Sequence, residues 1–225
     1  GDKVLTGNSC GGKYEKCIEP LQYLYSDRTL SAEIIPGKSV IGIAVDPENR
    51  LAVAIDYIMT TGWGGYGIDI PTLENTPSSG AGIYVRGERD SYLIRDGKAN
   101  TAKILAYGRS NGISYPAAEA AYNYQPGSCS SSSWCGRGNW YLPSNWQVFP
   151  YFDNRATIHL MLKAINKMPD DWWYTRNDFY TVTSNEINAK ESGFIYINTG
   201  GMAHGGKNLT EPDNLQTLVL PYITY

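Results

Sequence analysis

Two glycine-rich stretches have the spacing of known chemical motifs, and the first is Gly62–Gly67. It matches the Gly-x-Gly-x-x-Gly fingerprint of dinucleotide sites, in which a helix begins at the glycines and its free N–H groups meet a pyrophosphate. The residues that follow, 68–71, read Ile-Asp-Ile-Pro and do not start a helix. We therefore expect no dinucleotide site here.

The second stretch, Gly108–Gly112, has the Gly-x-Ser-x-Gly spacing of a nucleophile elbow, in which a strand precedes the serine and a helix follows it. Here Ala102–Tyr107 is instead rich in helix formers, and Ile113–Pro116 is turn-like. Of the two histidines, His159 falls inside a predicted helix. We therefore expect no catalytic triad, assign no catalytic residue and predict that the chain is not an enzyme.

Residues 211–214 place two carboxylates and an amide around a proline. Such oxygens suit a hard cation, and calcium-dependent lectins use a Glu-Pro-Asn loop of this kind. A calcium site needs six or more oxygens, and no second ligand cluster follows before Tyr225. We expect an acidic turn and no cofactor, with Glu211 and Asp213 as a weak candidate for calcium.

An aromatic stretch stands between acidic and basic neighbours at Asp170–Arg176. If exposed, it is a platform for stacking sugar rings or docking a protein; if buried, it is part of a core wall. We take the exposed alternative as the candidate ligand-binding surface, together with the loop 200–206. The candidate residues are Trp172, Trp173, Tyr174, Arg176, Asn177 and His204.

The four cysteines fall in two close pairs, Cys10 with Cys17 and Cys129 with Cys135. Neither pair has the two-residue gap of a zinc knuckle or a redox motif, and no histidine lies nearby. We predict two local disulfides, which form in oxidising compartments. Four reduced thiols in a cytosolic protein are the alternative.

The composition limits the classes of partner. A formal net charge of −3, with scattered Lys and Arg, gives no footprint for nucleic acid, whereas 18 Tyr and 6 Trp against 4 Phe are typical of a binding surface. No apolar run is long enough to cross a membrane, so the chain is predicted not to be membrane-embedded. Since it begins at Gly1 without Met, we interpret it as the mature part of an exported protein, cell-surface or extracellular rather than periplasmic.

Apolar periodicity predicts the elements that must position these residues. Val40–Val45 and Leu51–Ile55 flank turn residues and predict a buried hairpin. Helices are predicted over Asn100–Tyr107 and Pro116–Tyr122, and a single long helix from about Ser144 to Lys167. The later expected strands are Phe179–Val182, Gly193–Ile197 and Thr217–Ile223.

Together these elements predict an α+β fold with a twisted antiparallel sheet, two helical layers and long irregular loops. We place one domain at residues 39–225. Residues 1–38 are polar and turn-rich, and are predicted to form an amino-terminal arm with a small loop closed by Cys10 and Cys17. Self-association through this arm is an alternative role for the chain.

The segment Trp140–Ser144 lies between a glycine-rich loop and the long predicted helix. Pro143 disfavours helix at the residue before it, and the Ser144 hydroxyl can cap the helix that follows. We therefore predict a structural corner made by Trp140, Leu142, Pro143 and Ser144. Tyr141 is the one member whose exposure would make it a binding residue.

The same segment resembles a hallmark of the bacterial C-type-lectin-like domains of Bacteroidetes surface and fimbrial proteins, Gly-x-Trp-Tyr-Leu-Pro-Ser, here at 138–144. The resemblance extends over residues 40–225, and Tyr180–Glu186 is similar to the family's later Tyr-Trp-Ser-Ser-Thr-Glu block. This chain has Thr where that block has Trp, and Asn145-Trp146 after the Pro-Ser. The resemblance implies a C-type-lectin-like fold, which is shared with formylglycine-generating enzymes and the variable proteins of retroelements.

The family resemblance and the aromatic stretch together predict a non-catalytic binding module, adhesin-like, that recognises a host or bacterial glycan or protein. One alternative is a variable receptor-binding protein of a diversity-generating retroelement or phage tail. Another is a formylglycine-generating-type enzyme, whose copper-holding cysteine pair has no counterpart here because both pairs lie in flexible loops. A structural subunit of a surface fibre is the third.

Overall fold

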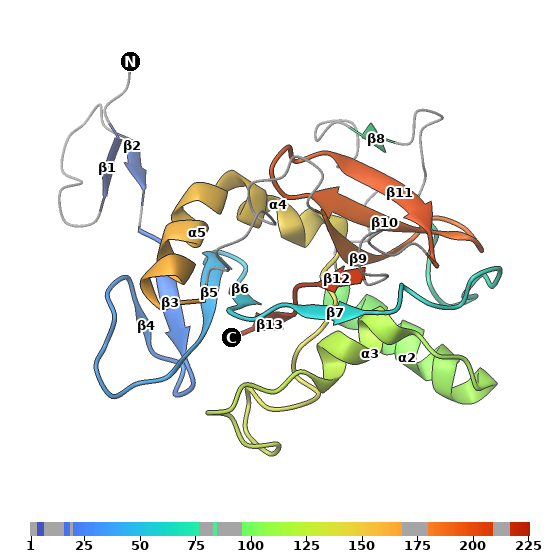
Figure 1. Ribbon diagram of the computed structural model, residues 1–225, viewed down its shortest axis with the longest axis horizontal. Coiled ribbons are helices and arrows are strands. Elements are labelled where there is room, and N and C mark those ends of the chain that lie inside the picture. Colours follow the sequence, from blue (N-terminus) through green and yellow to red (C-terminus); the bar gives the residue numbers. More distant parts are fainter. Residues whose placement is uncertain are drawn as a thin grey trace.

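The computed structural model describes residues 4–6, 16–18, 20–76, 83–84, 96–167, 180–208 and 217–225 (Figure 1). The helices are α2 (Gly97–Asn111), α3 (Pro116–Asn123), α4 (Asn145–Asp153) and α5 (Arg155–Ala164). The strands are β1 (Val4–Thr6), β2 (Lys16–Ile18), β3 (Gln22–Tyr25), β4 (Leu30–Ser31), β5 (Val40–Asp46), β6 (Leu51–Ala54), β7 (Ile58–Thr60), β8 (Ile83–Tyr84), β9 (Tyr180–Glu186), β10 (Glu191–Tyr196), β11 (Met202–Gly206), β12 (Thr217–Val219) and β13 (Tyr222–Thr224).

A five-stranded antiparallel sheet with the order β13-β6-β5-β3-β4 holds the predicted hairpin at its centre. β5 and β6 pair directly, with Ile43 opposite Val53, so the hairpin prediction is confirmed. Both strands are buried along almost their whole length. This explains their unbroken apolar runs, because a strand covered on both faces has no solvent side to make polar.

The same sheet includes residues that the sequence assigned to the arm. β3 pairs with β5, with Gln22 opposite Ala44, and Tyr25 is fully buried. A division at residue 38 therefore cuts through this sheet, between two of its paired strands. The sequence of Tyr23–Tyr25 suggests a short extended piece, but a strand of four residues is too brief to show by its pattern that it joins this sheet.

A second antiparallel sheet has the order β8-β11-β10-β9, and β12 pairs with β7 beside it. In the part of the chain that the structure describes, β1 and β2 form the one parallel pair. Within the described ranges, four helices and predominantly antiparallel sheets make this an α+β fold, as predicted.

The long helix predicted from Ser144 to Lys167 is wrong in one respect, because the structure divides it into α4 and α5 at Asn154. Pro150 lies inside α4 and contributes no backbone N–H to the helix. Asn154 stands between the two helices at φ −113° and ψ 14°, and its side-chain amide and its backbone N–H both donate to the Pro150 carbonyl, at 2.8 and 3.1 Å.

Helix α2 begins earlier than predicted, at Gly97. Asp96 caps it, and its carboxylate accepts a hydrogen bond from the Ala99 N–H at 3.0 Å. Asn100 and Thr101, which looked like the start of the helix, are instead buried in its first turns.

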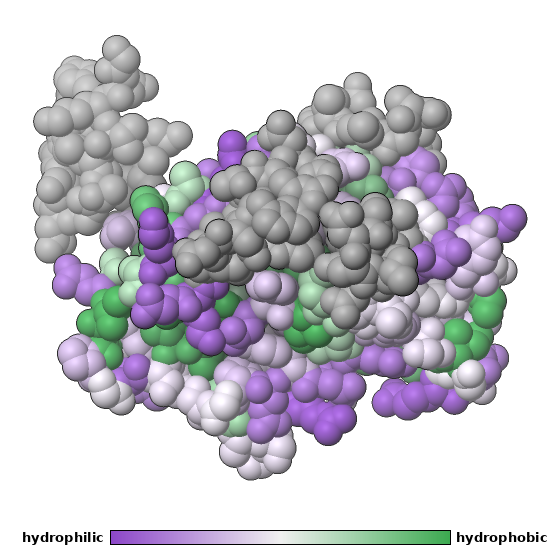
Figure 2. All heavy atoms as spheres, in the orientation of Figure 1, coloured by the Kyte–Doolittle hydropathy of each residue, from purple (hydrophilic) through white to green (hydrophobic). Residues whose placement is uncertain are grey.

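The helices cover the sheets in two groups (Figure 1). α4 and α5 pack against the five-stranded sheet through a core that includes Val148, Ile158 and Ile43. α2 packs against β9 of the four-stranded sheet, and α3 packs against α2 and the β7–β12 pair, in a core that includes Ile104, Ala118 and Val182. On the coloured atoms of the view in Figure 2, apolar side chains form small patches among hydrophilic ones. No helix in the described ranges is long and apolar enough to cross a membrane.

Candidate functional site

Most of the predicted ligand-binding residues lie outside the part of the chain that the structure describes. These are Trp172, Trp173, Tyr174, Arg176 and Asn177, and the same holds for the calcium candidates Glu211 and Asp213. His204 is described: it is half-buried in β11, and its Nδ1 contacts the Glu191 carboxylate. His204 is therefore engaged within the hairpin of β10 and β11.

The structure joins Cys129 and Cys135 in a disulfide with a Cα–Cα distance of 5.6 Å. Both cysteines are buried against the five-stranded sheet, in a cluster with Trp140 and Ile41. The Trp134 indole N–H donates to the Ser26 carbonyl at 2.8 Å and fixes the loop to the β3–β4 turn. This cross-link therefore holds a loop as the cover of one sheet face. Cys10, and the side chain of Cys17, lie outside the described residues.

The segment Trp140–Ser144 is buried throughout. The Trp140 indole donates to the Cys135 carbonyl at 2.8 Å, and Tyr141 pairs with Tyr222 as an isolated β-bridge. Tyr141 is 2 % exposed, and its hydroxyl lies 2.9 Å from Thr224 Oγ1, so it offers no binding surface. Ser144 caps α4 in a capping box with Gln147.

Next to the corner at Trp140–Ser144 lies a buried polar network that the sequence did not reveal. Gln147 Oε1 accepts hydrogen bonds from the N–H groups of Gly97 and Ser144, at 3.1 and 3.0 Å. Asn145 Oδ1 accepts from the Thr183 hydroxyl at 2.6 Å, and Asn145 N–H donates to Asn185 at 2.8 Å. The polar residues after Pro143 thus join α4, the start of α2 and β9. Since buried polar groups cost stability unless they are paired, these residues are constrained by structure.

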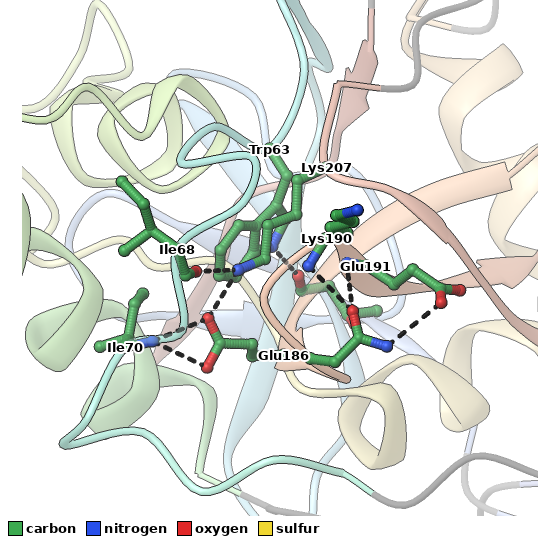
Figure 3. Close-up of polar contacts among 9 residues, drawn as sticks. Trp63, Ile68, Ile70, Glu186, Lys190, Glu191 and Lys207 are labelled. Carbon is green, nitrogen blue, oxygen red and sulfur yellow. Dashed lines mark hydrogen bonds and ion pairs between the residues drawn. The ribbon is translucent and has the colours of Figure 1, made fainter.

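A buried ion pair forms the other polar centre (Figure 3). Lys207 Nζ lies 2.7 Å from Glu186 Oε2, and both side chains have no exposed surface. Nζ also donates to the Ile68 carbonyl at 2.7 Å, and it lies 5.0 Å from the centre of the Trp63 ring. Both oxygens of Glu186 accept from the Ile70 N–H, each at 3.2 Å. Burial, which outweighs Lys207, raises the pKa of Glu186 to about 7.

This ion pair explains the first glycine motif. The backbone N–H groups of Trp63 and Gly64 both donate to the Lys207 carbonyl, at 2.8 and 3.1 Å. Gly62, Gly64, Gly65 and Gly67 all have a positive φ, which glycine adopts without strain. The glycine loop, Gly62–Gly67, is therefore wrapped over a buried lysine. Because neither charged side chain reaches solvent, the pair offers no group to a substrate.

The second glycine motif lies at an open surface. Gly108–Gly112 forms the last turn and cap of α2, and Gly112 at φ 65° donates to the Gly108 carbonyl. Beside it is a groove of about 470 Å³ between α2 and α3, which we call the α2–α3 groove. Its lining residues are Leu105, Gly108, Arg109, Gly112, Ile113, Ser114, Tyr115, Glu119, Tyr122 and Asn123. No sequence motif predicted this groove, since its walls come from two helices and the turn between them.

A smaller groove of about 380 Å³ lies at the β5–β6 turn, and its lining includes Asp46, Glu48, Asp153, Trp146 and Pro150. Asp46 is partly engaged, because it accepts hydrogen bonds from Asn49 at 2.8 and 3.3 Å. Among the described residues, no group of three or more His, Cys, Asp or Glu side chains is placed to hold a metal ion.

The described residues do not form the geometry of a nucleophile elbow. The motif serine, Ser110, is exposed inside α2, where an elbow requires the turn between a strand and a helix. His159 lies in α5 with its Nε2 3.1 Å from the Tyr151 hydroxyl. Burial and the neighbouring Arg155 lower the pKa of His159 to about 4.

No protein-family model matches the chain, and no curated protein matches it either. Among solved structures, the chain is similar to a fimbrial protein from Bacteroides ovatus, with a TM-score of 0.60 and 14 % sequence identity. The similarity covers 96 % of this chain and 51 % of that one, so the chain spans about half the length of the fimbrial structure. At this identity the comparison shows a shared fold.

Proposed function

We propose that this chain is an exported, non-catalytic binding module of a bacterial surface fibre, with a C-type-lectin-like fold. The observation that carries the proposal is the similarity over 96 % of the chain to a fimbrial protein. The motif at residues 138–144 supports the finer assignment of the fold, because its members make a buried corner between a disulfide-bonded loop and α4.

Two features support export to the cell surface. Cys129 and Cys135 are linked in a disulfide, and disulfides persist in oxidising compartments. The similar solved structure is that of a fimbrial protein from Bacteroides ovatus. The proposed partner is a host or bacterial glycan or protein.

A structural subunit of the fibre is the second candidate, and the same fimbrial neighbour favours it. It differs in the expected behaviour of the purified chain, since a structural subunit associates with its own copies. Light scattering over a range of concentrations separates the two. A strict monomer at high concentration argues against the structural subunit.

The binding proposal is tested with an array that carries glycans and extracellular-matrix proteins, probed with the folded chain with and without EDTA. We expect saturable binding to at least one member. The absence of binding to every glycan and protein would contradict a binding module. Loss of binding in EDTA would support a calcium site that includes Glu211 and Asp213, and unchanged binding would rule it out.

A further inference from the structure

We propose that the α2–α3 groove is a carbohydrate site that holds a pyranose ring against Tyr122 and binds two adjacent hydroxyl groups. This inference rests on the proposed function, because it names the ligand class of the binding module. It assigns the site to residues outside the aromatic stretch 170–176.

The groove has one large exposed aromatic side chain. Tyr122 is 39 % exposed, although most large apolar and aromatic side chains of the described residues are buried. Leu105 and Ile113 are half-buried and add a small apolar area beside it. An aromatic ring next to a limited apolar area suits the C–H face of a sugar, whereas an apolar peptide anchor requires a deeper and wider apolar pocket.

The polar groups of the groove offer both a hydrogen-bond acceptor and donors. Glu119 Oε1 accepts from the Tyr115 N–H at 3.0 Å, and the Ser114 hydroxyl lies at longer range, which leaves acceptor capacity on Oε2. Arg109 is exposed and forms no ion pair with the described residues. Asn123 Oδ1 accepts a hydrogen bond from Arg137 at 2.9 Å. The NH₂ group of Asn123 is therefore the part of this amide that can donate to a ligand.

This combination matches a vicinal diol, in which each hydroxyl both donates and accepts. A carboxylate accepts from two hydroxyls, while a guanidinium and an amide donate to their oxygens. Charges of both signs, Arg109 and Glu119, line the groove, so it does not have the excess of positive charge that selects a phosphate. The groove volume of about 470 Å³ is within the range of small-ligand sites.

The groove is also held in shape before a ligand arrives. The Ile113 N–H donates to the Gly108 carbonyl at 2.9 Å, which fixes the turn between the helices. A Cβ at Gly108 would lie 2.7 Å from the Ile113 carbonyl oxygen, so glycine permits this close approach. The Tyr122 carbonyl accepts from Gly138 N–H at 2.8 Å and anchors the end of α3. A preformed site loses little conformational entropy on binding.

The test measures binding of the full chain to immobilised gastric mucin by biolayer interferometry, before and after mild periodate treatment. Periodate cleaves the carbon–carbon bond between adjacent hydroxyls and leaves the protein part of mucin largely intact. We expect periodate to abolish binding. Binding that survives periodate, or no binding to untreated mucin, would overturn the carbohydrate assignment.

Variants then locate the site. We expect Tyr122→Ala to weaken mucin binding about tenfold or more, as for an aromatic hot spot, and Tyr122→Phe to retain it. Tyr66→Ala is the matched control, because Tyr66 is also an exposed tyrosine, at 52 %, but lies on the glycine loop outside the groove. Arg109→Gln is expected to weaken binding, and Lys103→Gln, on the same helix, is not.

The outcomes separate this inference from the proposed function. If the chain binds mucin or a matrix protein, but Tyr122→Ala binds as the wild type does, the groove assignment fails and the binding module stands. If neither mucin nor any member of the array binds, both fail. Thermal unfolding of each variant shows that a loss of binding is not a loss of fold.

Discussion

The glycine loop and the turn Gly108–Gly112 both contact Tyr115, from opposite edges of its ring. A Cβ on Gly65 would lie 2.7 Å from the Tyr115 hydroxyl oxygen, and one on Gly108 would lie 3.0 Å from Tyr115 Cδ2. Beyond Tyr115 the two regions differ. The glycine loop encloses a charged pair without exposed surface, whereas the turn opens on a groove with exposed Arg109 and Tyr122.

The two regions use glycine in the same way but differ in the side chains that lie beside it. In both regions glycine allows backbone and side chains to approach closely, which is a packing role. In the groove, glycine is accompanied by an accessible charged side chain, Arg109, whereas the charged pair under the glycine loop has no exposed surface. The comparison therefore predicts large effects on stability from changes at the ion pair, and effects on binding with little change in stability from changes at the groove.

The largest expected effect follows from Lys207→Met, which leaves Glu186 buried without its cation. We expect a loss of about 3–5 kcal/mol in the free energy of unfolding, measured by urea denaturation. The double variant Lys207→Met with Glu186→Leu should recover much of this loss, because a buried apolar pair needs no charge compensation.

The matched control is Lys38→Met, which removes an ion pair with Asp27 at the surface, 2.6 Å apart. It should leave the unfolding free energy nearly unchanged, because solvent screens exposed pairs. Equal losses in Lys38→Met and Lys207→Met would show that burial of the pair does not set its importance.

The next effect compares two glycines with the same φ of +65°. Gly65→Ala places a methyl group against the Tyr115 ring, whereas a Cβ at Gly112 meets nothing within 4 Å. Both variants carry the strain of a left-handed alanine, about 1–2 kcal/mol. We expect Gly65→Ala to lose about 1–3 kcal/mol more by overpacking, measured by thermal and urea unfolding. A larger loss in Gly112→Ala would reverse the comparison.

The pH dependence of stability gives a further test of the ion pair. The pKa of Glu186 is raised to about 7 in the folded chain from an ordinary value of 4.5. Its protonated form therefore favours folding below pH 4.5, and this contribution is lost as the pH rises through 7. We expect the unfolding free energy of the wild type, relative to Glu186→Gln, to fall between pH 4.5 and 7.

His159 titrates in the opposite sense over a similar range, since the pKa of its ring is lowered to about 4 from 6.5. Its contribution is present above pH 6.5 and is lost as the pH falls through 4. Because it is common to the wild type and Glu186→Gln, it cancels in their difference. A flat difference curve would contradict the raised pKa of Glu186.

The smallest effect is expected at the groove. Arg109→Gln should change the unfolding free energy by no more than about 0.5 kcal/mol, because Arg109 is exposed and has no ion pair among the described residues. Urea denaturation of this variant measures its unfolding free energy, and biolayer interferometry measures its mucin binding. A loss of several kcal/mol would make Arg109 a structural residue and remove the contrast between the two regions.

Local sequence signals predicted the elements better than the groove. The β5–β6 hairpin was predictable because two apolar runs flank a turn of Asp46, Pro47 and Asn49, and this signal is contained within 16 residues, 40–55. The break at Asn154 was missed, since apolar periodicity continues across it and was given more weight than Pro150, a residue that interrupts the backbone hydrogen bonds of a helix.

The buried ion pair and the groove were beyond such reasoning for a physical reason. Glu186 is the last residue of β9 and Lys207 directly follows β11, and Ile70, which donates to Glu186, lies more than 100 residues earlier in the chain. Lys is normally a surface residue, so its type predicts exposure. The groove likewise depends on the packing of α2 on α3, which periodicity within one helix does not specify.

The order of the five-stranded sheet has a consequence for mechanical load. Gln22, Ala44, Ala52 and Ile223 stand opposite one another in a single row across β3, β5, β6 and β13. Three strand spacings separate the ends of this row, a span of about 14 Å. Tension applied at residues 22 and 223 would therefore pull β3 and β13, the outer strands of this row, away from each other. The hydrogen bonds between neighbouring strands of the row would break one after another. The four-stranded sheet, α2, α3 and the groove would lie outside the path of this tension.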